Sequence, residues 1–448
     1  MKDDAPILRS ILRLAWPGVV LVAFQFAVSI ADTHFVGHLG TAPLAGLALV
    51  FPLVMLLQMM TAGAMGGGVA SAIARALGAR DHVRAEALLA HAMMLALVLG
   101  VAFAVIVVVL GPSLYRLLGG RDEAIHQAIV YSTALFAGAP LAWIANFSAA
   151  ALRGMGNTII PAIVLSVAAI VHIALSGALT LGFGPIPALG IAGTALAYVL
   201  GFGLAAAGLA LVLVFARLPI RLRLKGVAWS WTHCAPILRV GAVSSLSALQ
   251  TVITALALTG YVSRFGTEAL AGYGVGVRLE LLQVPLVNAV GAALVALVGM
   301  NIGAGRHERA KRIAWTGTGL AALICALIGG GAAIFPQSWV GMFSSESAVL
   351  AAGESYLRIV GPWYPFIGVG VALYFASQGV GLVGWPVLAG TVRLAIALGG
   401  GWIVLALGGG LHALYIMIAI GIIAWGALTA IAVARTRWGQ SERSAVSG

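Results

Sequence analysis

Long apolar segments run through most of this chain and decide what it can fold into. Each of twelve stretches is long enough to cross about 30 Å of hydrocarbon as an α-helix. Residues are 61% hydrophobic and only 8% charged, whereas soluble domains carry about 25% charged residues. Membrane-barrel strands are shorter and alternate strictly, so we predict an all-α polytopic membrane protein. The predicted spans are 11–37, 44–73, 88–112, 128–152, 159–184, 189–216, 237–262, 269–299, 314–335, 350–377, 386–407 and 411–434.

The net charge of +12 is distributed unevenly between the two sides of a twelve-span topology. Only Arg116, Arg121 and Arg264 fall in the loops opposite to the majority. Cytoplasmic loops of membrane proteins are enriched in lysine and arginine, so we expect both termini in the cytoplasm and the chain in the cell inner membrane. The basic residues on the majority side are Lys2, Arg9, Arg13, Arg75, Arg80, Arg84, Arg153, Arg217, Arg221, Arg223, Lys225, Arg239, Arg306, Arg309, Lys311, Arg312, Arg435, Arg437 and Arg443.

An internal repeat divides the chain into halves. The segment ILRLAWPG…VGHLGTAPLAG, at 11–46, aligns without gaps on ILRVGAVS…VSRFGTEALAG, at 237–272. The stretches RGMGNTIIP and QGVGLVGWP, which begin at Arg153 and Gln378, align at an offset of 225, one residue less than the offset of 226 for the first segment. Parallel repeats of this kind build two bundles around a central cavity. We therefore predict a six-helix lobe at 1–216, a basic cytoplasmic linker at 217–236, a second pseudo-symmetric six-helix lobe at 237–434 and a cytoplasmic tail at 435–448, with a V-shaped cavity between the lobes.

One carboxylate, Asp32, lies inside the first apolar segment. A charged group in hydrocarbon costs roughly 2.5 to 3.5 kcal/mol on insertion scales and usually has a partner or a function. Gln25 and Ser29 precede it on the same helical face, and this polar face is expected to line the substrate cavity. Pro17, about four turns earlier, removes a backbone donor and marks a possible hinge. The alternative is a carboxylate that only fixes helix packing.

These residues resemble the multidrug and toxin extrusion (MATE) transporters, and within them the DinF-like branch. The resemblance covers essentially the whole chain. The most specific motifs are the first-span pattern with Pro17, Asp32 and VGHLG, the stretch LRGMGNT at 152–158, GIAGTALA at 190–197, and RLELLQVP…GMNIGAGR at 278–306. The resemblance implies export of bulky, often cationic or amphipathic compounds in exchange for protons or sodium ions by alternating access.

Pro17 and Asp32 match the bending proline and the cation-site aspartate of the family. Where some members carry an asparagine and an aspartate in the fifth span, this chain has His172 and Ser176, and a family threonine aligns with Tyr198. One carboxylate and an imidazole favour proton coupling, because sodium prefers several oxygen ligands. The alternative for His172 is a core histidine bonded to a backbone carbonyl. No cofactor or metal is expected; H⁺ coupling is preferred and Na⁺ remains possible.

Further residues are expected to line the substrate cavity. Thr180 continues the polar stripe of His172 and Ser176, and Gln58 with Met59 belongs to a methionine-rich stretch of the second span, suited to varied apolar ligands. The second half carries Leu258 at the position equivalent to Asp32, so we predict that coupling is confined to the first half.

The second half has its own intramembrane charges. Glu280 is either a second titrating group or part of a structural pair with Arg393, and Arg278 lies near it in the sequence.

No ATP-binding or zinc-protease motif is present, so we predict a transporter and not an enzyme or an ATP-driven pump. The alternatives are a sodium-coupled exporter or a flippase for lipid-linked precursors, which shares the two-lobe architecture but is expected to need more cavity cations. A channel-like subunit would need no titratable acid in its cavity. The expected partners are small-molecule substrates and the lipid bilayer, with no nucleic acid, and the chain is expected to work as a monomer.

Overall fold

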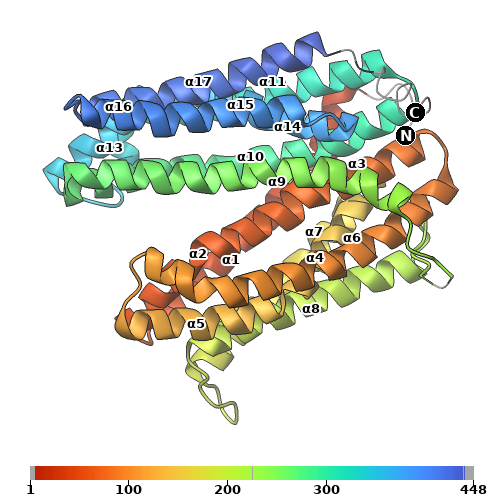
Figure 1. The fold of residues 1–448 in the computed structure, drawn as a ribbon, viewed down its shortest axis with the longest axis horizontal. Helices are drawn as coiled ribbons and strands as arrows, with labels where there is room; N and C mark the ends of the chain where they lie inside the picture. The colour runs from red at the N-terminus through yellow and green to blue at the C-terminus, as the bar shows by residue number, and fades with distance from the viewer. Residues whose placement is uncertain (1–5, 225, 437, 439–448) are drawn as a thin grey trace. The chain divides into compact units, whose positions relative to one another are not determined.

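The computed structural model describes residues 6–224, 226–436 and 438, and nearly all of them lie in helices (Figure 1). Their packing divides the chain into two compact units. The first-half unit contains Trp16–Gly241, and the second-half unit contains the residues from Ala242 onward together with the N-terminal residues up to Ala15. The chain therefore passes from one unit to the other inside its first helix, immediately before Pro17, and again inside α9 (Trp231–Val262).

The first-half unit is built from helices that follow one another through short turns. They are α1 (Ile7–Gly37) from Trp16 onward, α2 (Thr41–Gln58), the π-helix η1 (Met59–Ala64), α3 (Met65–Gly78), α4 (His82–Leu117), α5 (Asp122–Ala137), α6 (Ala139–Gly154), α7 (Ile159–Leu181) and α8 (Ile191–Phe215).

The second-half unit follows α9 and is also built from helices. Its elements are the 3₁₀ turn η2 (Ser263–Phe265), α10 (Thr267–Gly303), α11 (His307–Ile334), α12 (Pro336–Val340), α13 (Ser347–Val360), the 3₁₀ turn η3 (Gly361–Trp363), α14 (Tyr364–Val380), α15 (Gly384–Ala395), the π-helix η4 (Ile396–Gly400), α16 (Gly401–Ala406) and α17 (Leu411–Arg435).

Within the described residues, 11 helices are long and apolar enough to cross a membrane, and one bent pair brings the number of candidate spans to 12. The all-α membrane prediction is thus confirmed. The bent pair is α5 and α6, which meet at 48° where we predicted one straight span at 128–152. Pro140 at the start of α6 has no backbone N–H to continue the hydrogen bonding. Gly138 at the break lies against Val199 of α8, where a Cβ atom would come within 2.4 Å.

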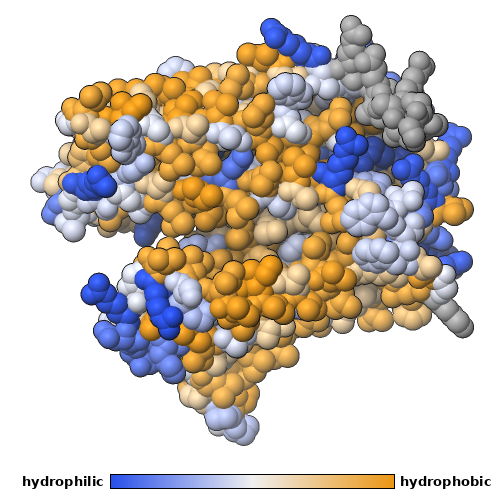
Figure 2. All heavy atoms as spheres, in the orientation of Figure 1, coloured by the Kyte–Doolittle hydropathy of each residue, from blue (hydrophilic) through white to orange (hydrophobic). Residues whose placement is uncertain are grey.

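The surface of each unit suits lipid. Figure 2 shows apolar side chains over the flanks of the helices and hydrophilic ones gathered toward helix ends. On α4, for example, Leu97, Val101 and Val105 are exposed. Because hydrocarbon offers no hydrogen bonds, a spanning helix satisfies its own backbone and exposes apolar side chains. The exposed apolar residues therefore mark membrane-facing sides.

The predicted division into lobes, linker and tail can be set beside the observed elements. Helix is absent from the described residues between Phe215 and Trp231, whereas the predicted linker at 217–236 extends into α9. Residues up to Ala15 group with the second-half unit, although we placed them in the first lobe. Lys2, Lys225, Arg437 and the tail from residue 439, including Arg443, lie outside the described residues.

Glycines set the close approach of the helices that carry the polar residues. A Cβ atom at Gly193 of α8 would lie 2.4 Å from the backbone carbon and oxygen of Leu179 in α7. One at Gly177 of α7 would lie 2.9 Å from the ring of Phe35 in α1. Small residues at helix contacts allow backbones to approach closely inside membranes. These contacts fix α7 between α1 and α8.

Candidate functional site

Asp32 of α1 is buried, and its carboxylate meets two side chains of α7. The Nε2 atom of His172 lies 2.9 Å from Oδ1 and 3.0 Å from Oδ2. The hydroxyl of Ser176 donates a hydrogen bond of 2.7 Å to Oδ1. His172 and Ser176 stand four residues apart, so they project from the same face of α7. The three residues form a compact group that we name the acid site.

The acid site can hold a proton in more than one position. If Asp32 is ionised, Nε2 of His172 donates to it; if Asp32 is protonated, a neutral imidazole can accept from the acid. The contact between the two side chains therefore persists when the proton moves from one to the other. Both groups are buried in protein, where an isolated charge is expensive, so the pair provides the compensation that each charged form needs.

Helix α1 is held less firmly than the other spans. Only 11% of its most apolar window is buried, the smallest share among the spans of the described chain. Within the helix, Pro17 leaves the carbonyl of Arg13 without its usual backbone donor. Asp32 and Phe35 are two residues through which α1 contacts α7.

Tyr198 of α8 lies beside the acid site without binding its carboxylate. Its ring packs edge-on against His172, with centroids 6.1 Å apart, and its hydroxyl accepts a hydrogen bond of 2.9 Å from Nε2 of Gln58. Gln58 is thereby tied to the same group. Tyr131 of α5, which we had not singled out, is also buried and lies within electrostatic range of Asp32.

Thr180 continues the stripe of α7 but does not reach Asp32. Its hydroxyl lies 2.8 Å from that of Thr194 in α8, and both residues are fully buried. Thr194 is one helical turn before Tyr198, the residue we aligned with a threonine of the family. A count of threonines in the predicted span 189–216 would have drawn attention to it, because Thr194 is the only one there.

The other predicted cavity residues of the first half lie apart from the acid site. Gln25 and Ser29 are exposed on α1, so the predicted polar face continues onto the surface of the helix. Met59 begins the π-helix η1. π-helical segments are frequent at functional sites, and no sequence pattern predicted this one.

A buried polar pair accompanies the π-helix. Nδ2 of Asn146 in α6 donates to Oγ1 of Thr61 over 3.0 Å, and Thr61 donates in turn to the carbonyl of Leu57. Neither Asn146 nor Thr61 was among the predicted site residues. The pair connects α6 to the irregular turn that follows Gln58.

In the second-half unit, Glu280 of α10 and Arg393 of α15 form the predicted pair. Nη2 of Arg393 lies 3.4 Å from Oε1 of Glu280. Glu280 also accepts a hydrogen bond of 3.1 Å from Tyr356. Arg278 does not join them, because its guanidinium stacks over the ring of Phe343, 5.3 Å from the centroid. Leu258 is buried where the first half has Asp32.

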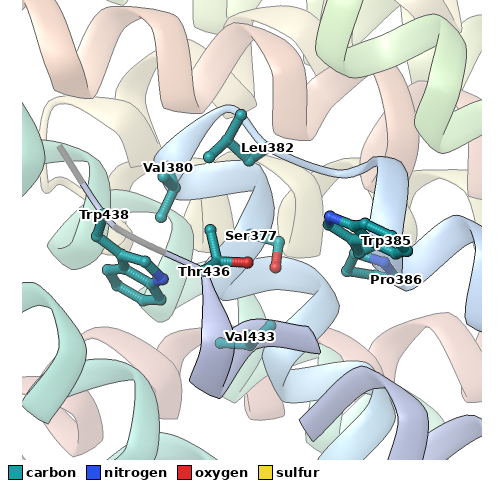
Figure 3. A pocket seen from close by; sticks show the side chains of 8 residues that line it. All are labelled: Ser377, Val380, Leu382, Trp385, Pro386, Val433, Thr436 and Trp438. Atoms are coloured by element: carbon teal, nitrogen blue, oxygen red, sulfur yellow. The ribbon is translucent and has the colours of Figure 1, made fainter. Parts of the chain in front are cut away.

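Small pockets lie among the described residues of the second-half unit, and two of them contain polar side chains. One lies where the end of α17 meets the turn between α14 and α15, under Trp438, and its lining is mostly apolar (Figure 3). It offers the hydroxyls of Ser377 and Thr436 but no ionisable group. The other is lined by α9, Arg393 and Trp425. Over the described ranges, no cluster of three or more histidine, cysteine, aspartate or glutamate side chains could hold a metal ion.

Comparison with known proteins identifies the family of this multi-pass helical membrane protein. The MatE family profile matches residues 17–176 and, a second time, residues 244–403. These matches cover more than half of the chain, so the chain belongs to the MatE family of transporters. The two matches also agree with the internal repeat.

Individual relatives are distant but cover most of the chain. It is 26% identical over 377 residues to a protein of Shewanella oneidensis named FAD transporter, with 82% of both chains covered. It is 26% identical to a probable multidrug resistance protein NorM of Thermotoga maritima, covering 85% of this chain and 82% of that one. A solved MOP superfamily transporter from Pyrococcus furiosus superposes with a TM-score of 0.88 at 25% identity, covering 99% and 97%. All three of these proteins are named as transporters or as a multidrug resistance protein.

Proposed function

We propose that the protein is a proton-coupled antiporter that exports bulky small molecules by alternating access, with Asp32 as the proton carrier. The observation that carries this proposal is the acid site, in which His172 and Ser176 occupy both oxygens of one buried carboxylate. A group of this kind exchanges a proton without a metal ligand set. The DinF-like assignment within the family is part of the proposal.

Protons are favoured over sodium by the ligands available. Sodium, like other hard cations, is held by several oxygen atoms. The acid site has one carboxylate, and an imidazole nitrogen faces both of its oxygens. A nitrogen that donates to the carboxylate occupies the position in which a cation would stand. Sodium exchange is therefore the second candidate for the coupling ion.

Movement of α1 can connect the proton to transport. Asp32 attaches this lightly buried helix to α7, and Pro17 lies where the chain leaves one compact unit for the other. A neutral acid tolerates a dry site, whereas the ionised acid needs water, a partner or a cationic substrate. Moving such an equilibrium from 1:99 to 99:1 needs about 5.5 kcal/mol of differential binding. We therefore propose that proton and substrate binding together bias the bend of α1.

The substrate class follows the named relatives. The multidrug proteins among them support export of cationic or amphipathic compounds. The relative named FAD transporter supports anionic aromatic cargo as a second candidate. A lipid-linked-precursor flippase is less well supported, because it is expected to need several cavity cations, and of the intramembrane arginines Arg278 stacks on Phe343. We further propose the inner membrane, cytoplasmic termini and a monomer.

Efflux from everted vesicles tests the coupling. Ethidium, a fluorescent cation, is added outside the everted vesicles, and its uptake into them is followed with either a pH gradient or a sodium gradient across the membrane. The parent protein is expected to respond to the pH gradient, and Asp32→Asn to lose this response while inserting normally. Glu268→Gln, an exposed acid at the start of α10, is the matched control. Transport by Asp32→Asn equal to that of the parent refutes the mechanism.

A further inference from the structure

A polar pocket in the second-half unit is lined by residues that mostly differ from their equivalents in the first half. Ser247, Gln250, Thr251 and Thr254 of α9 follow a helical spacing that puts them on one face, and this face lines a pocket with Arg393 of α15 and Trp425 of α17. At the repeat offset of 226 residues, the first half carries the apolar Leu21, Phe24 and Val28 for Ser247, Gln250 and Thr254, and Gln25 for Thr251. The two halves have therefore diverged, with an acid in the first and a cation beside polar groups in the second.

Arg393 has donors to spare in this pocket. Its side chain is 20% exposed, and the guanidinium lies over the Trp425 ring at 5.1 Å. In the described part of the chain, its one hydrogen bond is the 3.4 Å contact with Glu280. Strong arginine–carboxylate pairs are shorter and often bidentate, and a guanidinium has five N–H donors. Most of these donors are left for another acceptor.

The ring of Trp425 holds the guanidinium and is not free for a ligand. Its other face is covered by Gly370, where a Cβ atom would lie 2.9 Å away. Stacking on an aromatic ring fixes the plane of an arginine side chain. The remaining edge of Arg393 therefore faces the pocket in a preset orientation.

Gln250 supplies an unused acceptor at the opposite wall. Its Nε2 atom donates to Oγ1 of Thr391 over 2.8 Å. Its Oε1 atom is buried and, among the described residues, has no hydrogen-bond partner. Leaving a buried acceptor unpaired is unfavourable. A ligand that brings an O–H or N–H group would satisfy it.

We infer that this pocket is a binding subsite for the carboxylate or phosphate group of a transported molecule. In this subsite, Arg393 donates to the anionic oxygens of the ligand. Gln250 accepts from a hydroxyl of the ligand, and Ser247 and Thr251 lie on the same face of α9 as Gln250. Glu280 competes with the ligand for Arg393. The inference rests on the proposed export function, but binding of an anionic ligand to this pocket can be measured without transport.

Flavin mononucleotide and riboflavin form a matched pair of probes, because they differ by one phosphate group and both fluoresce. Binding to the purified full-length protein in phosphatidylcholine vesicles is followed by fluorescence anisotropy, without an ion gradient. Flavin mononucleotide is expected to bind roughly tenfold more tightly than riboflavin, as one charge-assisted hydrogen bond contributes. Arg393→Gln is expected to remove this difference, and Glu280→Gln to strengthen binding of the mononucleotide severalfold.

Controls separate a subsite from a loss of folding. The double variant Arg393→Gln with Glu280→Gln leaves no unpaired charge and should also bind both flavins equally. Arg358→Gln, an exposed arginine of α13, should keep the parent preference. The inference is overturned if the parent binds no mononucleotide or if the double variant keeps the preference. It is also overturned if phosphatidylglycerol in the vesicles displaces the mononucleotide from the parent, which assigns the pocket to a lipid headgroup. A parent that binds selectively but shows no pH-driven efflux would refute only the coupling proposal.

Discussion

The Nε2 atom of His172 faces both carboxylate oxygens of Asp32, at 2.9 Å and 3.0 Å, across the contact of α7 with α1. This contact joins the two groups of the acid site that can carry a proton and attaches the least buried span to its neighbours. A change in the proton content of the pair therefore acts directly on the attachment of α1. The predictions below test this relationship and the packing that supports it.

Replacing His172 with asparagine is expected to preserve folding and to shift the pH dependence of efflux. The amide can still donate to Asp32, but the site loses an imidazole that can carry positive charge beside the carboxylate. We expect the transport profile to move toward higher pH. Ethidium efflux measured from pH 5.5 to 8.5 checks this. His126→Asn, an exposed histidine of α5, is the control, and an unchanged profile in His172→Asn would return His172 to a packing role.

Ser176→Ala removes the 2.7 Å hydrogen bond to Oδ1 of Asp32. Hydrogen bonds to charged groups contribute about 1.5 to 3 kcal/mol, so the free energy of unfolding should fall by about this amount. In the Asp32→Asn background the same change should matter less, which a double-mutant cycle detects. Chemical unfolding in micelles gives the values, with Ser263→Ala, an exposed serine bonded to its own turn, as the control. Additive effects of Asp32→Asn and Ser176→Ala would contradict the bond.

The sequence was sufficient to predict the helical class, the repeat and the core of the acid site. Asp32 is conspicuous because a charge in an apolar span is expensive, and the four-residue spacing of His172 and Ser176 places both on one face of a helix. The pair of Glu280 and Arg393 was predictable for the same reason, since a lone intramembrane cation needs a partner.

The irregular features were not predictable, because partners far apart in the chain determine them. The π-helix at Met59–Ala64 accompanies a bond from Asn146 to Thr61, 85 residues away. At the break between α5 and α6, Gly138 lies against Val199 of α8, which is 61 residues away in the chain. The hydroxyl of Thr180 bonds to Thr194 and not to Asp32, although helical spacing alone was compatible with either partner.

Thr61→Val tests the buried pair at the π-helix. The substitution keeps the shape of the side chain but removes the acceptor of Asn146, whose Nδ2 atom then keeps only the carbonyl of Ala142. We expect the free energy of unfolding to fall by about 1 to 3 kcal/mol. Thr33→Val is the control, since Thr33 is exposed and bonds only to the carbonyl of Ser29. Equal stability of the two variants would show that the pair does not stabilise the π-helix.

Gly193→Ala is expected to disturb the acid site through packing alone. The added Cβ atom would lie 2.4 Å from the backbone of Leu179, and since backbone cannot rotate away, α8 must move from the end of α7 that carries Ser176 and Thr180. Overpacking of this kind costs about 1 to 3 kcal/mol, and we expect proton-driven efflux to fall at least tenfold. Gly203→Ala, also in α8, meets only Cδ1 of Leu141 at 3.5 Å and should be as active as the parent and slightly more stable, since alanine favours a helix over glycine by about 1 kcal/mol. Thermal unfolding and ethidium efflux of both variants check this. Equal activity of Gly193→Ala and Gly203→Ala would mean that the close approach of α7 and α8 is not needed to position the groups around Asp32.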